Sequence, residues 1–270
     1  MRPRTPSVLL LLTACAGTQP GVTPLPPRPA VLTYGPWTGR YVFVRHRHVE
    51  QVFQGQPLVT DLTSHLWLSV TTSVGDPGLR LELVVDSARV RGSGLAPGSA
   101  EGARGRRFEA DLYPDGRLEH VVRPSVANPL IDQLAFDLVD LLPLLPPGGA
   151  RSAATWTDTT RSSGTLQDMT LSIQSVNTRS TADWSAIDGG QGLEFNTAAR
   201  FTVTGRGEQA GQPFTLSGEG QGHAQHWLGA GGRLLRLIRG DSTRIDVDLP
   251  GVGLIIPVMQ QTTDTVRAVL

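Results

Sequence analysis

Two histidine pairs have the spacing closest to that of metal ligands. His46 and His48 are two apart in an alternating segment, so they share one strand face, but no third ligand lies nearby in the sequence. His223 and His226 are three apart, a spacing that suits ligands on a helix. The surrounding glycines favour a strand instead, in which residues three apart point to opposite faces. We therefore predict no metal site at either pair.

One aspartate pair is the nearest approach to acid–base chemistry. Asp246 and Asp248 share a strand face and could act as paired carboxylates, as in glycosidases, but no aromatic sugar platform can be assigned beside them. The chain also lacks a Gly-x-Ser-x-Gly elbow, a Walker-type phosphate loop and a His-Glu-x-x-His motif. We predict a non-enzymatic protein with no catalytic residue, no metal and no cofactor.

The N-terminus combines the parts of an export signal. Arg2 and Arg4 precede an apolar run over residues 8–12, and small residues follow. The sequence Leu12-Thr13-Ala14-Cys15 resembles the lipobox of bacterial lipoproteins, and Cys15 is the only cysteine. The resemblance implies that residues 1–14 are removed as a signal peptide. It also implies that Cys15 carries a diacylglycerol, which holds the protein to a membrane.

Residues 15–36 are predicted to be the lipidated end and a tether. The segment is rich in proline, which favours an extended linker over a packed core. Ala16 follows the cysteine. In diderm bacteria, the lipobox resemblance then implies sorting to the outer membrane of the cell envelope, facing the periplasm or the cell surface.

Residues 37–270 are predicted to form a single β-rich domain. The 31 glycines and 20 prolines indicate many turns, and a chain of 270 residues can bury a full core. The 24 basic and 24 acidic residues balance, so the charge does not predict nucleic-acid binding. Alternating sequence predicts strands over 39–49, 58–74, 79–91, 107–113, 117–123, 155–160, 168–187, 193–205, 213–227, 233–239, 243–249 and 254–269.

One amphipathic helix is predicted between two β blocks, residues 37–124 and residues 150–270. Within residues 125–149, Asn128 is a suitable N-cap and Pro129 suits the first helical position. Leucines at three- and four-residue spacing form one face of this helix, with Asp137 and Asp140 on the opposite side. A Pro-Pro-Gly-Gly run ends the segment. We expect the leucine face to pack on the concave face of a long, curved antiparallel sheet.

A faint internal repeat links the two β blocks. Residues 116–123 match residues 232–239 in four identities and two conservative apolar pairs, and Trp37 and Trp156 stand near the starts of the two blocks. Hairpins also come to resemble one another by convergence, so the alternatives of duplication and convergence both stay open. A duplication would give two similar meanders joined by the helix.

The tryptophans either fill the core or line an apolar cavity. A strongly curved sheet leaves more apolar inner surface than one helix can cover, which favours a cavity beside the helix. Its candidate lining is Leu134, Leu138, Leu141, Trp67 and Trp156. An apolar void beside the leucines would favour a ligand carrier, and a solid core there would favour a scaffold.

The expected architecture resembles the half-barrel lipoproteins of the LolA, LolB and LppX type. The likeness is one of architecture over residues 37–270 and rests on no shared motif, and a single helix replaces the several helices of those families. It implies a half-barrel or open barrel that binds or shuttles a lipophilic ligand or envelope component. The alternatives are a structural or protein-interaction module of the envelope and, third, an envelope hydrolase. The sequence does not identify a protein partner.

Overall fold

Eleven strands form one antiparallel sheet in the computed structural model, which describes residues 28–53, 55–76, 78–93, 95, 98–166, 169–209 and 211–269. The strands are β1 (Trp37–Phe53), β2 (Gln56–Val74), β3 (Leu79–Gly92), β4 (Arg107–Leu112), β5 (Leu118–Val122), β6 (Thr155–Leu166), β7 (Met169–Ile187), β8 (Gly190–Gln209), β9 (Gln212–Leu228), β10 (Leu234–Leu249) and β11 (Leu254–Val269). The helices are α1 (Ser99–Ala103) and α2 (Pro129–Leu138). The predicted mainly β fold is confirmed.

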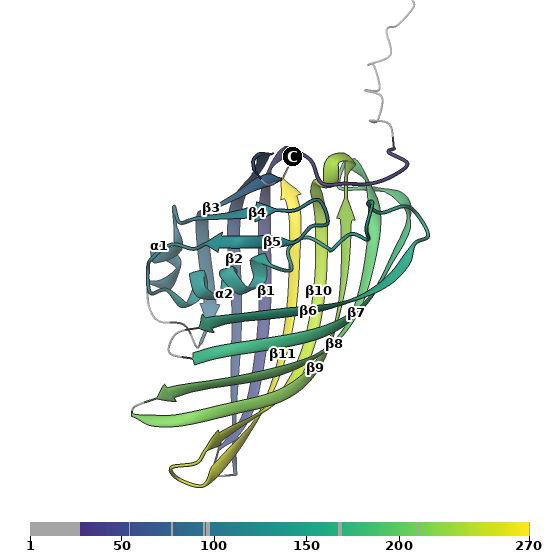
Figure 1. Ribbon diagram of the computed structural model, residues 1–270. Coiled ribbons are helices and arrows are strands. Elements are labelled where there is room, and N and C mark those ends of the chain that lie inside the picture. The colour runs from purple at the N-terminus through teal and green to yellow at the C-terminus, as the bar shows by residue number, and fades with distance from the viewer. Residues whose placement is uncertain are drawn as a thin grey trace, which may run out of the picture.

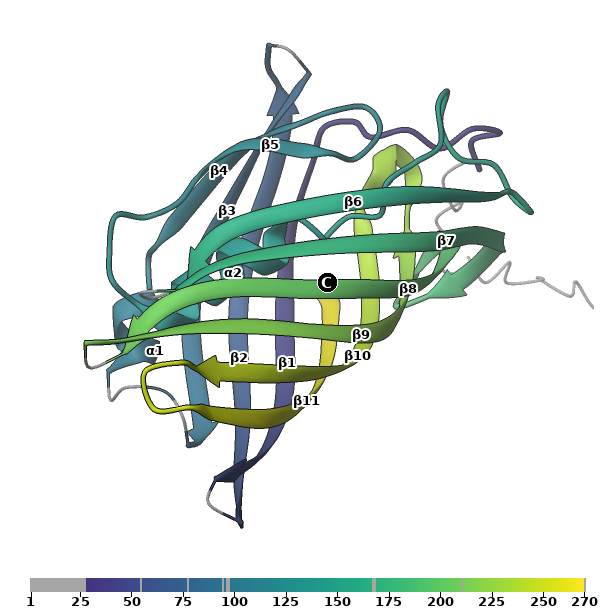
Figure 2. The ribbon, with the colours of Figure 1, turned by 60° about the horizontal axis from the view of Figure 1, so that its bottom comes forward.

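The strand order shows two meanders joined through the first and last strands. It runs β5-β4-β3-β2-β1-β11-β10-β9-β8-β7-β6, so β5 and β6 are the two edges of an open sheet. The strands curve strongly, and α2 lies between the two edges on the inner side of the curve (Figures 1 and 2). We call the side of the sheet toward α2 the inner face. This arrangement is the expected curved open sheet with a helix on its concave face.

Glycines on β9 allow large neighbouring side chains to lie flat against the sheet. A Cβ atom at Gly220 would stand 2.5 Å from the ring of Phe201, and one at Gly218 would stand 3.0 Å from Ile245. Gly222 continues the same face, because residues two apart in a strand point the same way. This stripe gives β9 little inner side-chain bulk, which suits strong curvature.

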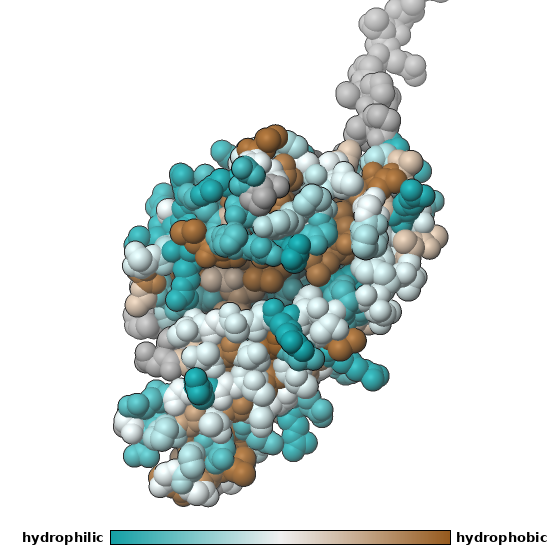
Figure 3. All heavy atoms as spheres, viewed as in Figure 1, coloured by the Kyte–Doolittle hydropathy of each residue, from teal (hydrophilic) through white to brown (hydrophobic). Residues whose placement is uncertain are grey.

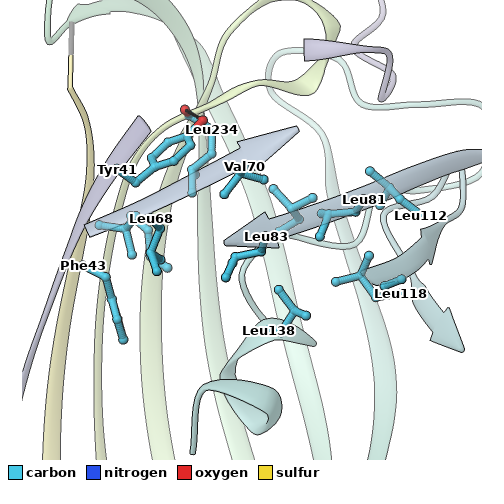
Figure 4. Close-up of a cluster of buried hydrophobic side chains, with 14 of the residues drawn as sticks. Tyr41, Phe43, Leu68, Val70, Leu81, Leu83, Leu112, Leu118, Leu138 and Leu234 are labelled. Carbon is cyan, nitrogen blue, oxygen red and sulfur yellow. Dashed lines mark hydrogen bonds between the residues drawn. The ribbon is translucent and has the colours of Figure 1, made fainter. Parts of the chain in front are cut away.

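The main core lies where α2 meets β1–β4 and the ends of β8–β11. Tyr41 and Phe43 of β1 are buried there, with leucines and valines of β2, β3 and α2 packed around them (Figure 4). The Tyr41 hydroxyl donates to the Leu234 carbonyl at 2.9 Å. Burial raises the pKa of Tyr41 to about 12 because the low-dielectric surroundings disfavour the phenolate. The tyrosine therefore acts as a neutral donor that ties β1 to β10.

The N-terminus of α2 follows the predicted capping. The Asn128 side chain accepts from the backbone N–H groups of Leu130 at 3.0 Å and Ile131 at 3.3 Å, and Pro129 occupies the first helical position. Asn128 also donates to the Ser99 carbonyl at 2.9 Å, which joins the two helices. The Asn128 amide thus caps α2 and also binds the neighbouring helix α1.

Three local expectations need correction. The helix ends at Leu138, so Leu141 lies beyond it. Residues 233–239 and 243–249 do not form two strands, because β10 runs continuously from Leu234 to Leu249. The segment between β3 and β4, for which the sequence predicts neither a strand nor a helix, contains the short helix α1. In each case, tertiary pairing or packing overrides the local sequence signal.

The end of the predicted tether belongs to the fold. Leu32 forms an antiparallel bridge with Ala150 and is 1% exposed. The buried hydroxyl of Tyr34 donates to the Pro143 carbonyl at 2.6 Å. Gly116, at φ 90°, leaves room for this ring, since a Cβ there would stand 2.7 Å from it. Residues 32–34 therefore pack against the segment that follows α2, and residues 1–27 lie outside the described part of the chain.

Candidate functional site

The register of the strands arranges the inner face into layers. Residues that pair across neighbouring strands form rows perpendicular to the strands, and every second residue points inward. One row contains Phe43, Val266, Leu237, His226 and Phe195, and all of these except His226 are apolar. The next row contains Arg45, Asp264, Arg239, Ala224, Thr197 and Arg179. A belt of charge therefore follows directly on the apolar core.

Four charged residues close a ring in this belt. Asp264, which is fully buried, accepts from Arg45 Nε at 2.6 Å and Nη2 at 2.7 Å, and also from Arg239 Nε at 2.9 Å. Asp137 of α2 lies 2.6 Å from Arg45 Nη1 and 3.2 Å from Arg239 Nη2. Two cations and two anions thus balance, and α2 is joined to three strands.

This ring covers the acidic side of α2 as well, through Asp137. Asp137 was placed opposite the covered leucine face, but its side chain is only 18% exposed and faces two buried guanidinium groups. The guanidinium groups of Arg45 and Arg239 hold the pKa of Asp264 below its usual value, because they favour the carboxylate more than burial disfavours it. The helix is therefore anchored on both of its sides.

A second polar cluster occupies the β6–β7 end of the belt. Arg179 Nε donates to Asp158 Oδ2 at 2.5 Å, and Asn177 donates to Asp158 Oδ1 at 2.7 Å. His226 is 3% exposed nearby, and burial together with Arg179 and Arg239 lowers its pKa to about 3. The imidazole is therefore neutral at physiological pH and cannot serve as a general acid–base group that titrates near pH 7.

Arg47 and Asp241 stand in the next row and take no part in these pairs. The row runs Arg47, Thr262, Asp241, Gly222, Ala199, Asn177 and Asp158. Arg47 Nε is buried and has no hydrogen-bond partner among the residues that the structure describes. Burial and the nearby Arg45 lower the pKa of Arg47, and burial raises the pKa of Asp241. For both groups, burial disfavours the charged form more than the nearby opposite charges favour it.

Beyond this row the inner face becomes apolar again. We call the distal strip the inward residues Ile173, Val203, Leu216, Ile245, Val247 and Val258. Val203 and Leu216 are each 7% exposed, and the other four are partly exposed. None of the six belongs to the core that α2 covers. Phe136 of α2 reaches the edge of this region, since a Cβ at Gly164 of β6 would stand 2.9 Å from its ring.

The candidate cavity residues from the sequence separate in the structure. Leu134 and Leu138 are 5% and 1% exposed and belong to the main core, which is the solid packing expected of a scaffold. Leu141 and Trp156 are partly buried and pack against this core, and Trp156 meets Phe195 edge to face at 6.3 Å. Trp67 lies on the outer face, where His65 stacks on it and Arg89 lies 5.6 Å from its ring. The five residues do not line one cavity.

The histidine pairs behave as the strand geometry predicts. His46 and His48 share the outer face of β1, where His48 contacts Asp61 at 2.7 Å and Glu50 at 2.9 Å. His223 lies on the outer face against Gly240, whereas His226 points inward. Among the described residues, no group of three or more histidine, cysteine or acidic side chains is arranged to hold a metal ion.

The outer face carries at least two open hollows. The larger, about 780 Å³, crosses β7–β11 and is lined by residues such as Thr178, Ala198, His223, Ser242 and Gln261. A twisted sheet is saddle-shaped, so each face is concave along one diagonal. In Figure 3 the outer surface of β6–β9 is largely pale, and apolar side chains gather in the band between the β5 and β6 edges, where α2 lies.

Sequence reasoning missed the charged belt, although a signal for it exists. Arg45 and Arg47 alternate in phase with Tyr41 and Phe43, so a buried inner face must carry them inward. Asp264 is likewise in phase with Val266 on β11. A charge in register with apolar neighbours on a covered face indicates a buried ion pair, but only the fold reveals its partner.

Comparisons with known proteins leave the family undetermined. No family model and no curated protein matches the chain. Among solved structures, OccK2 (OpdF) of Pseudomonas aeruginosa in complex with glucuronate is 10% identical, with a TM-score of 0.26 over 86% of this chain and 98% of that chain. OpdK of the same organism with vanillate is 8% identical, with a TM-score of 0.25 over 86% and 99%. OmpT, an outer membrane protein of Vibrio cholerae, is 8% identical, with a TM-score of 0.15 over 86% and 99%. Scores this low carry no argument about this protein.

The sequence predicts one point of membrane contact, the lipid on Cys15. No helix in the described ranges is both long and apolar enough to span a membrane. Cys15, with the signal peptide before it, lies outside the described residues, so its lipidation stays a prediction.

Proposed function

We propose that this protein is a lipid-anchored protein of the bacterial envelope that binds a lipophilic ligand on the distal strip without catalysing a reaction. One observation carries the proposal: the inner face turns apolar again beyond the charged belt, and its apolar residues lie outside the core that α2 covers. Burying exposed apolar side chains against a ligand stabilises a complex by about 25 cal/mol per Å². The anchor at Cys15 places this strip near a membrane that supplies lipophiles.

The ligand site differs from the one expected from the sequence. Leu134 and Leu138 are buried in the main core, where they hold α2 in place and are not available to a ligand. The ligand surface is instead the inner face of β7–β11 past the belt, on the strands that lie below α2 in Figure 1. In this arrangement the charged ring fixes α2, and α2 leaves the distal strip accessible.

Native mass spectrometry and lipid extraction test this proposal. The protein is the full chain with Cys15→Ala, purified without detergent. We expect a co-purifying lipophile or saturable binding of dodecanol, and weaker binding by Ile245→Asp on the strip. A matched Met259→Asp on the exposed outer face of β11 should leave binding unchanged. A chain that carries no lipophile and binds no apolar probe would contradict the carrier function.

The anchor has its own test. Replacing Cys15 by Ala should move the protein from the membrane fraction to the soluble fraction, because the acyl chains that bury in the bilayer are lost. Fractionation in a diderm host would also show which membrane holds the wild-type protein. Membrane association that survives the substitution would contradict the lipobox assignment, and an inner-membrane location would contradict outer-membrane sorting.

A structural or protein-interaction module is the second candidate. Two observations favour it. Leu134 and Leu138 pack solidly, and among the described residues β6 pairs only with β7, which leaves one edge of this 12-residue strand without a neighbouring strand there. Such an edge can accept a strand from a partner. Proline substitution at Thr159 on β6 would then abolish partner capture in the envelope while leaving dodecanol binding intact.

A further inference from the structure

We propose that the ligand is an anionic amphiphile whose carboxylate binds Arg47 and whose hydrocarbon chain lies along the distal strip. This inference rests on the proposed function and adds the chemical class of the ligand. Two features carry it: a partly buried arginine whose buried Nε has no described partner, and an apolar surface that follows it along the same strands.

Arg47 differs from the other arginines of the inner face in its pairing. Arg45 and Arg239 share Asp264 and Asp137, and Arg179 pairs with Asp158. The structure gives Arg47 no ion pair within the described residues, and its buried Nε has no hydrogen-bond partner there. A guanidinium is always protonated, and leaving a buried charged donor unsatisfied is costly. A bound anion would satisfy it.

The neighbouring acidic residues do not pair with the positive charge of Arg47. Asp137 is close enough to stabilise the charge of Arg47 electrostatically, but it already forms ion pairs with Arg45 and Arg239. Asp241 stands in the same row as Arg47, but Thr262 of β11 separates them, and no ion pair joins them. A carboxylate fits this position because it can accept two parallel hydrogen bonds from one guanidinium.

The register places a hydrocarbon chain in line with this head-group position. Val49, Gln260 and Thr243 form the row after Arg47, and the row with Val258 and Ile245 follows. At about 3.4 Å per residue, the Ile245 row lies about 14 Å along the strands from the row of Arg47. The Val247 row lies about 20 Å away by the same rise. The inner face therefore presents, in order, a cation, a short mixed zone and an apolar strip.

Specificity follows from the same geometry. A cationic amphiphile would place like charge beside Arg47 and Arg45. A neutral alcohol would reach the strip but could not accept a bidentate pair. Charge-assisted hydrogen bonds are stronger than neutral ones, so a tenfold or larger preference for the carboxylate is the expected scale.

Isothermal titration calorimetry on the full chain with Cys15→Ala tests the inference. The probes are dodecanoate, dodecanol and dodecyltrimethylammonium, each below its micelle concentration. We expect dodecanoate to bind at least tenfold more tightly than dodecanol, and the cationic probe to bind most weakly. Arg47→Gln should remove the preference for dodecanoate and leave dodecanol binding unchanged, whereas Arg47→Lys should keep part of it. Arg200→Gln, on the outer face, is the matched control.

The outcomes separate the two proposals. Equal binding of dodecanoate and dodecanol to the chain with Arg47 intact would overturn the carboxylate assignment while supporting lipophile binding. Unchanged dodecanoate preference in a folded Arg47→Gln chain would also overturn it. Failure of all three probes to bind would overturn both proposals. The comparison among probes needs no substitution at Arg47, so misfolding of a variant cannot leave the inference undecided.

Discussion

Replacing Asp264 by Asn should destabilise the fold more than any single exposed charge replacement. Asp264 is fully buried and accepts bonds from both Arg45 and Arg239, so its neutralisation leaves two buried cations facing Asp137 alone. In the Asn side chain, an NH₂ group replaces one carboxylate oxygen, and this hydrogen-bond donor would face the guanidinium donors of Arg45 and Arg239. Breaking one partner of a buried charge pair costs about 3 to 5 kcal/mol. We expect a loss of at least about 3 kcal/mol in the free energy of unfolding, on the same scale.

Urea unfolding followed by circular dichroism measures this loss. Asp246→Asn is the matched control, because it makes the same change on the exposed outer face of β10 and should stay within about 0.5 kcal/mol of the wild type. A double-mutant cycle with Arg45→Met and Asp264→Leu should show coupling of about 1 to 3 kcal/mol, because Arg239 and Asp137 remain paired in the double variant. Additive effects, or a loss below about 1 kcal/mol for Asp264→Asn, would refute the reasoning.

The pH dependence gives an independent check with a definite sign. The folded state lowers the pKa of Asp264 below 3.8, so its contribution to stability is present above that value and is lost as the pH falls through the folded pKa. The wild type should therefore lose stability below about pH 4, and Asp264→Asn should lose less over the same range. Equal acid sensitivity of the two proteins would contradict the assignment.

Four further predictions concern other buried and paired groups. Asn128→Ala removes the cap of α2 and should lower the free energy of unfolding by about 1 to 2 kcal/mol in urea titrations; an unchanged midpoint would contradict the capping role. Asp241→Asn should be at least as stable as the wild type at pH 7, because burial raises the pKa of Asp241 and makes its ionised form unfavourable; a clear loss of stability would reveal a partner. In an NMR titration, His226, with a pKa of about 3, should not titrate between pH 5 and 8. His48 should titrate above its usual value because of hydrogen bonds to Glu50 and Asp61, so the stability it contributes is lost as the pH rises through that raised pKa; titration of His48 at or below 6.5 would contradict this.

Local sequence determined most of the secondary structure. Alternation with a period of two predicts a strand wherever one face is covered, and the long strands of the second block follow that pattern. Asn128 and Pro129 located the start of α2 because capping is a local interaction. The same reasoning placed His223 and His226 on opposite faces, since only the pleat of the strand is needed.

Local patterns failed where the outcome depended on distant partners. The leucine spacing continued past Leu138, but α2 ends there and the chain turns to pack Leu142 and Leu145 into the core. Leu32 and Tyr34 looked like part of a tether because their partners, Ala150 and Pro143, lie more than 100 residues away. Proline content alone therefore misjudged where the folded domain begins.

The sequence by itself determined a β-rich chain with alternating strands, a capped helix at Asn128 and a lipobox-like Cys15. Only the tertiary structure decided which alternating face lies inside, because a strand pattern that is apolar on both sides does not specify its covered side. That choice turned Arg45, Asp264 and Arg239 inward to meet Asp137. It also set Arg47 at the border between the charged belt and the distal strip. The function proposed for this protein depends on that border, which arises when six strands align their inner residues in register.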